Sequence, residues 1–412
     1  MPKSKKDRDI LRALASEVAE IAALPVQEQK RRLWRALNAL RPERPMVTVY
    51  QAPWNEIGLT FECEDAECRN YEWHLRTAIY RHKHFDADYV TEPFVEVHKA
   101  VNSTGWGVQA EVESVATDPE NVIRGQHFTN QFNTDADLDK IKTPILTYDT
   151  AETARRMDVA SELFDGVIET RLVGFDPGYM SFWDPISGWM SVEDALYAII
   201  DRPEYIHEML ERMTRGYLSM LDQAEALDVL CQSQQSTHWN YVGTQVDELP
   251  QPSSDPAHPR VRDLWCWGMA QMFSTVSPDI FAEFEIAYFK RLAKRFGLVY
   301  YGCCEPLDDR IAQIREISNV RKISMSPWTN QARGAAAIGG DYVFSRKPNP
   351  ALLAGDIFHE ERVRADLAET LRICREYDCP CELILKDVST IGYDPSRLDR
   401  WTRIAMELVE SM

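Results

Sequence analysis

Short apolar runs recur along this chain, and each of them ends in polar or aromatic residues. The eight runs cover residues 46–50, 89–97, 169–173, 229–231, 298–301, 322–325, 342–344 and 382–385. Runs of this length and composition predict buried strands, and helical periodicity separates most of them. Eight alternating strand and helix units predict an α/β fold, a single (β/α)8 TIM barrel. A doubly wound open sheet is the alternative, but no GxGxxG turn follows the first run.

The chain divides into residues 1–45, expected to form N-terminal helices on the barrel, and residues 46–412, the barrel itself. Two apolar stripes mark the N-terminal helices, which either plug the bottom of the barrel or extend into a partner subunit of a homodimer. Periodicity weakens across residues 99–147, so this segment is expected to form an insertion or lid over the barrel mouth. Helical patterning resumes at Asp263, after a proline-rich loop.

Composition and charge exclude several classes of protein. The formal net charge of −19 repels phosphate backbones and anionic membranes, so neither nucleic acid nor membrane is an expected partner. No apolar run approaches the ~20 residues that a bilayer crossing needs, and the basic N-terminal stretch has no signal-peptide core. We therefore expect a cytoplasmic protein. Its nine cysteines are expected to be reduced thiols.

The run at 298–301 ends in an unusual sequence, Gly302, Cys303, Cys304, Glu305 and Pro306. Two adjacent thiols and a carboxylate at a strand exit can bind a metal or a reactive carbon. The alternative for the cysteine pair is two small, buried hydrophobic side chains. Active sites of barrels gather at the C-terminal ends of the strands, which is where this sequence falls.

Other strand exits carry further candidates. Residues 231–241 read CQSQQSTHWNY, a hydrogen-bonding surface with an aromatic wall that suits a polar small molecule. A buried, satisfied histidine is the alternative for His238. The aromatic loop 176–189 is expected to wall the same cleft. The candidate catalytic residues are Cys304, Glu305, Asp387 and His238, and the candidate substrate-binding residues are Gln234, Gln235, Trp239, Trp328, Arg346, Asn349 and Lys386.

The order of these pieces resembles the uroporphyrinogen decarboxylase superfamily, which also contains corrinoid-dependent methyltransferases. The resemblance covers most of the chain, including CQSQQSTHW, the helix MFSTVSPDIFAEFEIAYFKRL before GLVYYGCCEP, and the closing LILKDVSTIGYDPSRLDRW. It implies a single distorted (β/α)8 barrel. True uroporphyrinogen decarboxylases carry an arginine-rich motif like RQAGRY, whereas the first strand here leads into VYQAPWNEIG. The chain is therefore more similar to the methyltransferase branch.

Zinc methyltransferases of this superfamily hold their metal with a His-x-Cys motif at the fifth strand and a Cys at the eighth. The equivalent positions here are residues 302–304, which read GCC, and Asp387, so a cysteine is kept and the histidine is not. A rearranged zinc site would consist of Cys304, Asp387 and either Glu305 or His238. Cys304 is expected to be the ligand and the preceding cysteine to matter less, because adjacent side chains at a strand end point to opposite faces.

The resemblance implies a methyltransferase acting between a small methylated substrate, such as an aryl methyl ether or a methylamine, and the cobalt of a separate corrinoid protein. The corrinoid is assigned to a partner because this chain has no DxHxxG segment. A metal, or protonation by Glu305 or by a cysteine or lysine neighbour, would activate the leaving group. The alternative is a decarboxylase or other lyase for a planar acid, with Arg346 and Lys347 clamping a carboxylate and Asp387 or Glu305 donating a proton. A binding protein on a barrel that has lost its chemistry is the third hypothesis.

Overall fold

A parallel sheet of seven strands forms the centre of the fold. The computed structural model describes residues 3–115, 125–231, 238–239 and 242–412. The strand order is β1–β15–β14–β13–β12–β11–β8, and each neighbouring pair is parallel. The strands are β1 (Met46–Val49), β8 (Tyr179–Met180), β11 (Trp265–Gly268), β12 (Leu298–Tyr301), β13 (Val320–Met325), β14 (Val343–Arg346) and β15 (Cys381–Leu385).

Helices surround this sheet, and many begin at a capping side chain or a proline. Ser4 caps the first helix and Asp65 caps the fourth, each accepting a hydrogen bond from the first turn. None of the helices in the described residues combines the length and apolar composition of a membrane span. The helices are α1 (Lys5–Ala22), α2 (Pro25–Asn38), α3 (Trp54–Ile57), α4 (Ala66–His84), α5 (Thr150–Phe164), α6 (Trp183–Met190), α7 (Val192–Asp201), α8 (Pro203–Ala226), α9 (Pro278–Phe281), α10 (Ala287–Ala293), α11 (Ile311–Ile314), α12 (Gln331–Ile338), α13 (Ala351–Ala354), α14 (Glu360–Glu376) and α15 (Ser396–Glu410).

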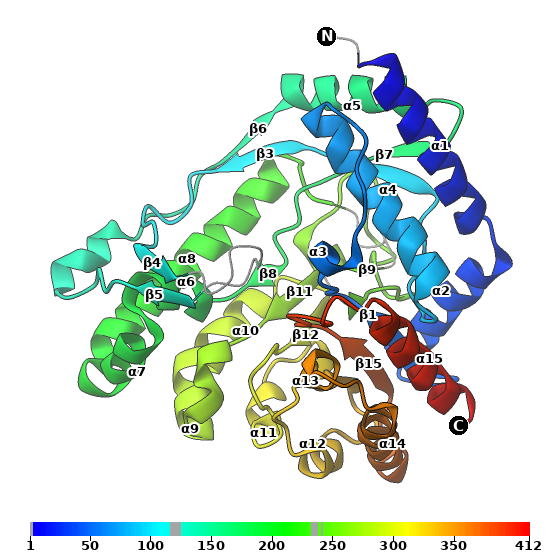
Figure 1. Ribbon diagram of the computed structural model, residues 1–412. Coiled ribbons are helices and arrows are strands. Elements are labelled where there is room, and N and C mark those ends of the chain that lie inside the picture. The colour runs from blue at the N-terminus through cyan, green and yellow to red at the C-terminus, as the bar shows by residue number, and fades with distance from the viewer. Residues whose placement is uncertain (1–2, 116–124, 232–237, 240–241) are drawn as a thin grey trace.

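Figure 1 shows the sheet near the centre of the molecule, with α11, α12 and α14 gathered below it and α1, α4 and α5 above. A second parallel pair, β2 (Phe94–His98) with β7 (Glu169–Val173), lies outside the seven-stranded sheet. One parallel bridge joins Phe175 to Leu230. Gly174 permits this approach, because a Cβ there would lie 2.1 Å from the carbonyl oxygen of Leu230. In the described residues the sheet is open, with β1 and β8 at its edges.

The predicted α/β class is confirmed, and seven of the eight apolar runs form strands. The run at 229–231 is the exception, with only a single bridge, and the run at 89–97 becomes a strand only from Phe94. Two strands, β8 and β11, are not predicted from the sequence, because residues 176–189 were expected to form a loop and helical patterning was expected to resume at Asp263. Trp265 and Trp267 suit a strand or an amphipathic helix equally, and four residues are too few for periodicity to decide.

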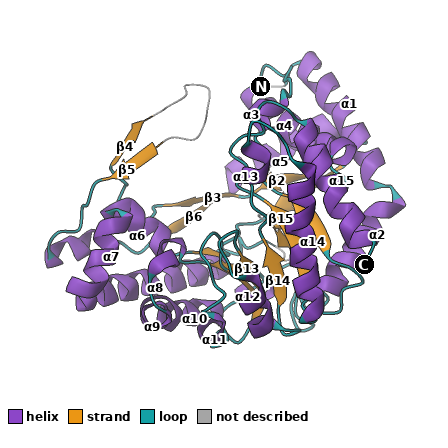
Figure 2. Cartoon of the chain, turned by 60° about the horizontal axis from the view of Figure 1, so that its bottom comes forward, coloured by secondary structure: helices purple, strands orange, loops and turns teal. Residues whose placement is uncertain are grey.

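The segment 99–147 contains two antiparallel strand pairs. One consists of β3 (Ala100–Ser103) and β6 (Leu146–Asp149), and the other of β4 (Val112–Val115) and β5 (Gly125–Phe128). The β4–β5 pair projects away from the rest of the chain in Figure 2. Its role as a lid stays a prediction. A short antiparallel pair, β9 (His238–Trp239) with β10 (Val242–Gly243), lies further along the chain.

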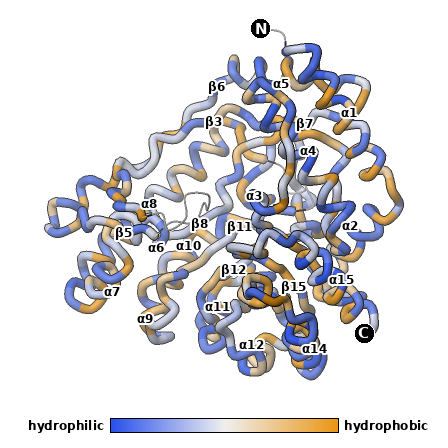
Figure 3. Tube along the Cα trace, in the orientation of Figure 1, coloured by the Kyte–Doolittle hydropathy of each residue, from blue (hydrophilic) through white to orange (hydrophobic). Residues whose placement is uncertain are grey.

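The two faces of the seven-stranded sheet differ in chemistry. One face carries Val299, Ile323 and Phe344, which belong to the large hydrophobic core shared with the helices. The helices alternate hydrophilic and hydrophobic segments along their length, as expected for elements with one buried side (Figure 3). The opposite face carries Lys322 and Glu382, both 0% exposed, whose side chains form an ion pair of 2.7 Å.

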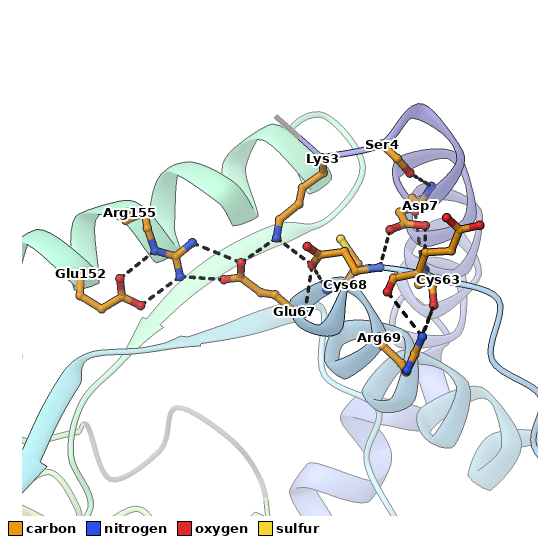
Figure 4. Close-up of polar contacts among 11 residues, drawn as sticks. Lys3, Ser4, Asp7, Cys63, Glu67, Cys68, Arg69, Glu152 and Arg155 are labelled. Carbon is orange, nitrogen blue, oxygen red and sulfur yellow. Dashed lines mark hydrogen bonds and ion pairs between the residues drawn. The ribbon is translucent and has the colours of Figure 1, made fainter. Parts of the chain in front are cut away.

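The N-terminal segment is attached through a chain of charged side chains (Figure 4). The Lys3 ammonium donates to Asp65 at 2.8 Å and to Glu67 at 2.9 Å, at the start of α4. Arg155 of α5 donates to the same Glu67 at 3.2 Å. The Asp7 carboxylate accepts from the backbone N–H groups of residues 64 and 65. These contacts dock α1 beside α4 and α5, where its apolar stripe is buried.

The buried pair gives a stability prediction. Lys322→Met leaves the Glu382 carboxylate buried without its cation, so we expect a loss of about 3–5 kcal/mol in the free energy of unfolding. The double variant Lys322→Met/Glu382→Leu should regain most of that loss. Chemical denaturation measures both, with Lys290→Met, in the exposed pair with Glu316, as a control expected to change by less than about 0.5 kcal/mol. A double variant as unstable as the single one would contradict the prediction.

Candidate active site

The exit of β12 is fixed by a glycine and a serine. Gly302 has a φ of +98°, and a Cβ there would lie 2.3 Å from Cδ1 of Leu307, so this turn requires glycine. The Ser324 hydroxyl, on β13, donates to the carbonyl oxygen of Cys303 at 2.8 Å. The backbone that carries the two cysteines is therefore held against the neighbouring strand.

A lysine that directly follows β15 joins the two thiols to a carboxylate. The Lys386 ammonium lies 3.0 Å from Sγ of Cys303, 3.5 Å from Sγ of Cys304 and 3.0 Å from Oδ2 of Asp387. The Cys304 thiol donates to the same carboxylate oxygen at 3.5 Å. Gln51, following β1, accepts a hydrogen bond from the backbone N–H of Asp387 at 3.1 Å. We call Cys303, Cys304, Lys386 and Asp387 the thiol corner.

The charges of the thiol corner follow from these contacts. The hydrogen bond from Cys304 lowers the pKa of Cys303 to about 7, with Lys386 acting in the same direction and burial opposing them. The same bond, together with burial, raises the pKa of Cys304. Burial acts to lower the pKa of Lys386, but the two thiols and Asp387 outweigh it, and the pKa is raised. Near neutral pH the corner thus holds an ammonium, a thiol and a partly ionised second thiol.

A second lysine follows β14 on the same face of the sheet. The Lys347 ammonium donates to the hydroxyl of Ser345 at 2.6 Å and lies 5.0 Å from the ring centroid of Tyr300. Burial lowers the pKa of Lys347 to about 7. The hydroxyl of Ser345 donates in turn to Glu382 at 2.5 Å. Polar groups therefore extend from the thiol corner over the face of the sheet that carries Lys322 and Glu382.

Glu305 does not take the role that the sequence predicts, as an acid or ligand beside Cys304. It is fully buried, and its two carboxylate oxygens accept from the backbone N–H groups of Ala270 at 3.0 Å and Cys303 at 2.9 Å. Burial raises its pKa, and these hydrogen bonds oppose the rise. Both oxygens are engaged with backbone, so Glu305 braces the loops after β11 and β12.

The predicted zinc ligands do not assemble. Among the described residues, no group of three His, Cys, Asp or Glu side chains is placed to hold a metal ion. The Lys386 ammonium lies within hydrogen-bonding distance of Cys304 and Asp387, the two ligands that the sequence analysis would pair on a metal. A lysine cation and a zinc ion cannot both occupy this position, so the residues present do not fit the predicted site.

His238 lies apart from the thiol corner. Its Nε2 accepts a hydrogen bond from the backbone N–H of Val90 at 2.9 Å, and its ring stacks on Tyr89 with 4.5 Å between centroids. Trp34 of α2 contacts the ring edge-on. Burial lowers the pKa of His238 to about 3, so the ring is neutral. His238 is therefore a buried histidine whose hydrogen bond is satisfied, which is the alternative that the sequence left open.

Two further candidates, Arg346 and Asn349, have partners elsewhere, and a third, Trp328, is exposed. Arg346 is buried on the helical face of β14, where it lies 3.6 Å from Asp366 of α14. Asn349 accepts from the backbone N–H of Ala351 at the start of α13. Trp328 is 75% exposed and therefore does not wall an enclosed cleft.

The rest of the predicted cleft is only partly described. Gln234 and Gln235 lie outside the described residues, and Trp239 enters only through its backbone pairing in β9. Within the loop 176–189, Trp183 and Trp189 are buried in the main hydrophobic core.

One charged residue near the corner, Arg81 on α4, is not among the candidates that the sequence singles out. A cavity of about 680 Å³ is lined by Arg81 together with Asp387 and Trp54. Strand exits guided the choice of candidates, and a helical arginine gives no such signal. The aromatic residues that precede it in sequence, Trp54 and Trp73, were the only local hint.

The thiol corner predicts a titration near neutral pH. The ultraviolet absorbance of thiolate, taken as the difference between wild type and Cys303→Ser, should rise with a midpoint at about 7. Lys386→Met removes a stabilising positive charge and should move this midpoint upward, toward that of an ordinary thiol. A midpoint that Lys386→Met leaves unchanged would contradict this assignment.

The same geometry predicts that the corner does not retain zinc. Protein incubated with zinc and then desalted should carry no stoichiometric metal by atomic absorption, because the ammonium of Lys386 competes with a cation at this position. Retention of one zinc per chain in the wild type, lost in Cys304→Ala, would contradict this expectation.

Comparison with known proteins gives a single kind of match. No family model matches this chain, and no curated protein matches it. Among solved structures, a methyltransferase from Methanosarcina mazei is similar over 92% of this chain and 97% of its own, with a TM-score of 0.50 and 12% sequence identity. At this identity the likeness shows a shared fold, and that α/β fold extends over nearly the whole of both chains.

Proposed function

We propose that this chain is a methyltransferase that moves a methyl group between a small methylated donor, such as an aryl methyl ether or a methylamine, and the cobalt of a separate corrinoid protein. The thiol corner carries the proposal, because one ammonium there contacts two thiols that follow β12 and a carboxylate that follows β15. The fold shared with a protein named a methyltransferase supports it.

The chemistry concerns the atom that loses the methyl group. When the bond between the methyl carbon and its oxygen or nitrogen breaks, the electron pair stays on that heteroatom, which then needs a proton. The Lys386 ammonium is placed to stabilise this developing charge and to give the proton, which solvent restores. Asp387 and Cys303 hold the ammonium in position. A corrinoid on the partner protein supplies the cobalt that accepts the methyl group.

No metal enters this proposal, since Lys386 takes the position between Cys304 and Asp387 that a Lewis acid would need. The lyase alternative has weaker support, because Arg346 and Lys347 lie on opposite faces of the sheet. Arg346 contacts Asp366 on α14, whereas Lys347 contacts Ser345 on the interior face. These two cations therefore do not form one carboxylate clamp.

We also infer that β2, β7 and residues 229–231 complete a ring with the seven-stranded sheet. The parallel bridge between Phe175 and Leu230 supports this arrangement, as does the pairing of β8, which follows β7 in sequence, with β11. An experimental structure in which β2 lay far from β1 would refute it.

Methyl transfer to free cob(I)alamin tests the function. A panel of aryl methyl ethers and methylamines serves as donors, and the visible spectrum reports formation of methylcobalamin. We expect Lys386→Met to lower kcat/KM by about 10²–10³-fold, since it removes the charge that stabilises the leaving atom.

Lys290→Met, at an exposed and ion-paired lysine, is the matched control and should leave the rate unchanged. Full turnover in Lys386→Met, or no transfer from any donor by wild-type protein, would refute the proposed function.

Because a rim cysteine contributes little to packing, Cys304→Ala should slow the reaction without lowering thermal stability.

A further inference from the structure

The cavity beside the thiol corner contains an arginine, Arg81, that has no carboxylate partner among the residues that the structure describes. This cavity, of about 680 Å³, lies where β1 and β15 end, and Asp387 lines it together with Tyr50, Trp54, Trp73 and Arg81. Its volume is within the usual range for small-molecule sites. The cavity adjoins the thiol corner, because Asp387 belongs to both.

Arg81 lies between aromatic rings and not beside an acid. Its guanidinium carbon is 5.3 Å from the ring centroid of Trp54 and 4.7 Å from that of Tyr89. Its Nε is buried, and within the described residues neither a hydrogen-bond acceptor nor a carboxylate pairs with this side chain. Arg76 on the same helix pairs with Glu62 and Glu72. A buried donor without an acceptor is costly, so Arg81 is set up for an acceptor from outside the chain.

The charge balance of the cavity favours an anion. Asp387 is the acid among the lining residues, and it is already paired with Lys386 at 3.0 Å. Burial raises the pKa of Tyr50, while the positive charges of Arg81 and Lys386 oppose the rise. Arg81 thus contributes the unpaired charge.

Arg81 also lines a smaller cavity of about 280 Å³. That cavity contains the carboxylates of Glu92 and Glu96, and Glu92 is paired with Arg31 at 2.9 Å. Two acids there disfavour an anionic ligand, so the larger cavity is the one that suits it.

We propose that the larger cavity binds a planar aromatic carboxylate, with the carboxylate on Arg81 and the ring against Trp54 and Trp73. The guanidinium fork matches a carboxylate, and the indole faces match a flat ring. The orientation rests on the proposed function: the methylated group of the ligand points toward Asp387 and the thiol corner. The substrate class is then a methoxylated aromatic acid, and Arg81 is the residue that selects it.

Isothermal titration calorimetry with two probes of nearly equal shape tests the inference. Para-methoxybenzoate carries the charge and para-methoxybenzamide does not. Wild-type protein should bind the acid at least about tenfold more tightly than the amide, and Arg81→Met should bind the two equally. Arg81→Lys keeps the charge without the fork and should retain a reduced preference. Lys83→Met, on the same helix and paired with Glu17, should match the wild type.

Equal affinity of wild-type protein for acid and amide would overturn the inference, as would a preference for the acid that survives in Arg81→Met. If circular dichroism shows that Arg81→Met is unfolded, the comparison of wild type with Arg81→Lys decides. Binding is measured without cobalamin, so the outcome is independent of methyl transfer. Arginine-dependent binding without transfer would refute only the proposed function, and transfer from neutral donors without acid binding would refute only this inference.

Discussion

Parallel hydrogen bonding from β12 through β13 and β14 to β15 and β1 brings the carboxyl ends of these strands to one edge of the sheet, and the candidate site depends on this pairing. Cys303 and Lys386 meet there although they are 83 residues apart in sequence. A slip of one residue in the register of β15 would turn Lys386 to the helical face. The thiol corner thus depends on the register of the strands more than on local sequence.

The interior face of the sheet combines several ionisable groups, and their charges balance in two sets. Lys322 is neutralised by Glu382, and Lys386 by Asp387 together with Cys303. Burial and the neighbouring lysines lower the pKa of Lys347 to about 7, while Glu382 and Cys303 act against them. Because Lys347 titrates at neutral pH beside the ammonium of Lys386, this face of the sheet can change its net charge without a change in packing.

Cys303 was expected to matter less than Cys304, but the structure places both thiols beside Lys386. Strand exits pointed to Cys304, Lys386 and Asp387, because chemistry at the ends of parallel strands is a property of the fold class. They were insufficient for Glu305 and Arg346. The direction of Glu305 depends on the backbone N–H groups that its loop leaves open, which no residue pattern reveals. Arg346 was paired with the residue that follows it, although successive side chains on a strand point to opposite faces. The strand β11 was missed because its four residues carry too little periodicity, and its identity is fixed by pairing with β8 and β12.

Two types of interaction hold different parts of this protein in place. The sheet and its helices are held by burial, whereas the start of the chain is tied down by Lys3, Glu67 and Arg155 through partly exposed ionic contacts. Burial is weakened by denaturant and scarcely by salt, and exposed ion pairs are screened within a Debye length of about 8 Å at physiological ionic strength. Ionic strength and denaturant therefore act on different parts of this protein. The docking of its first residues on α4 and α5 can loosen in salt while the seven-stranded sheet stays intact.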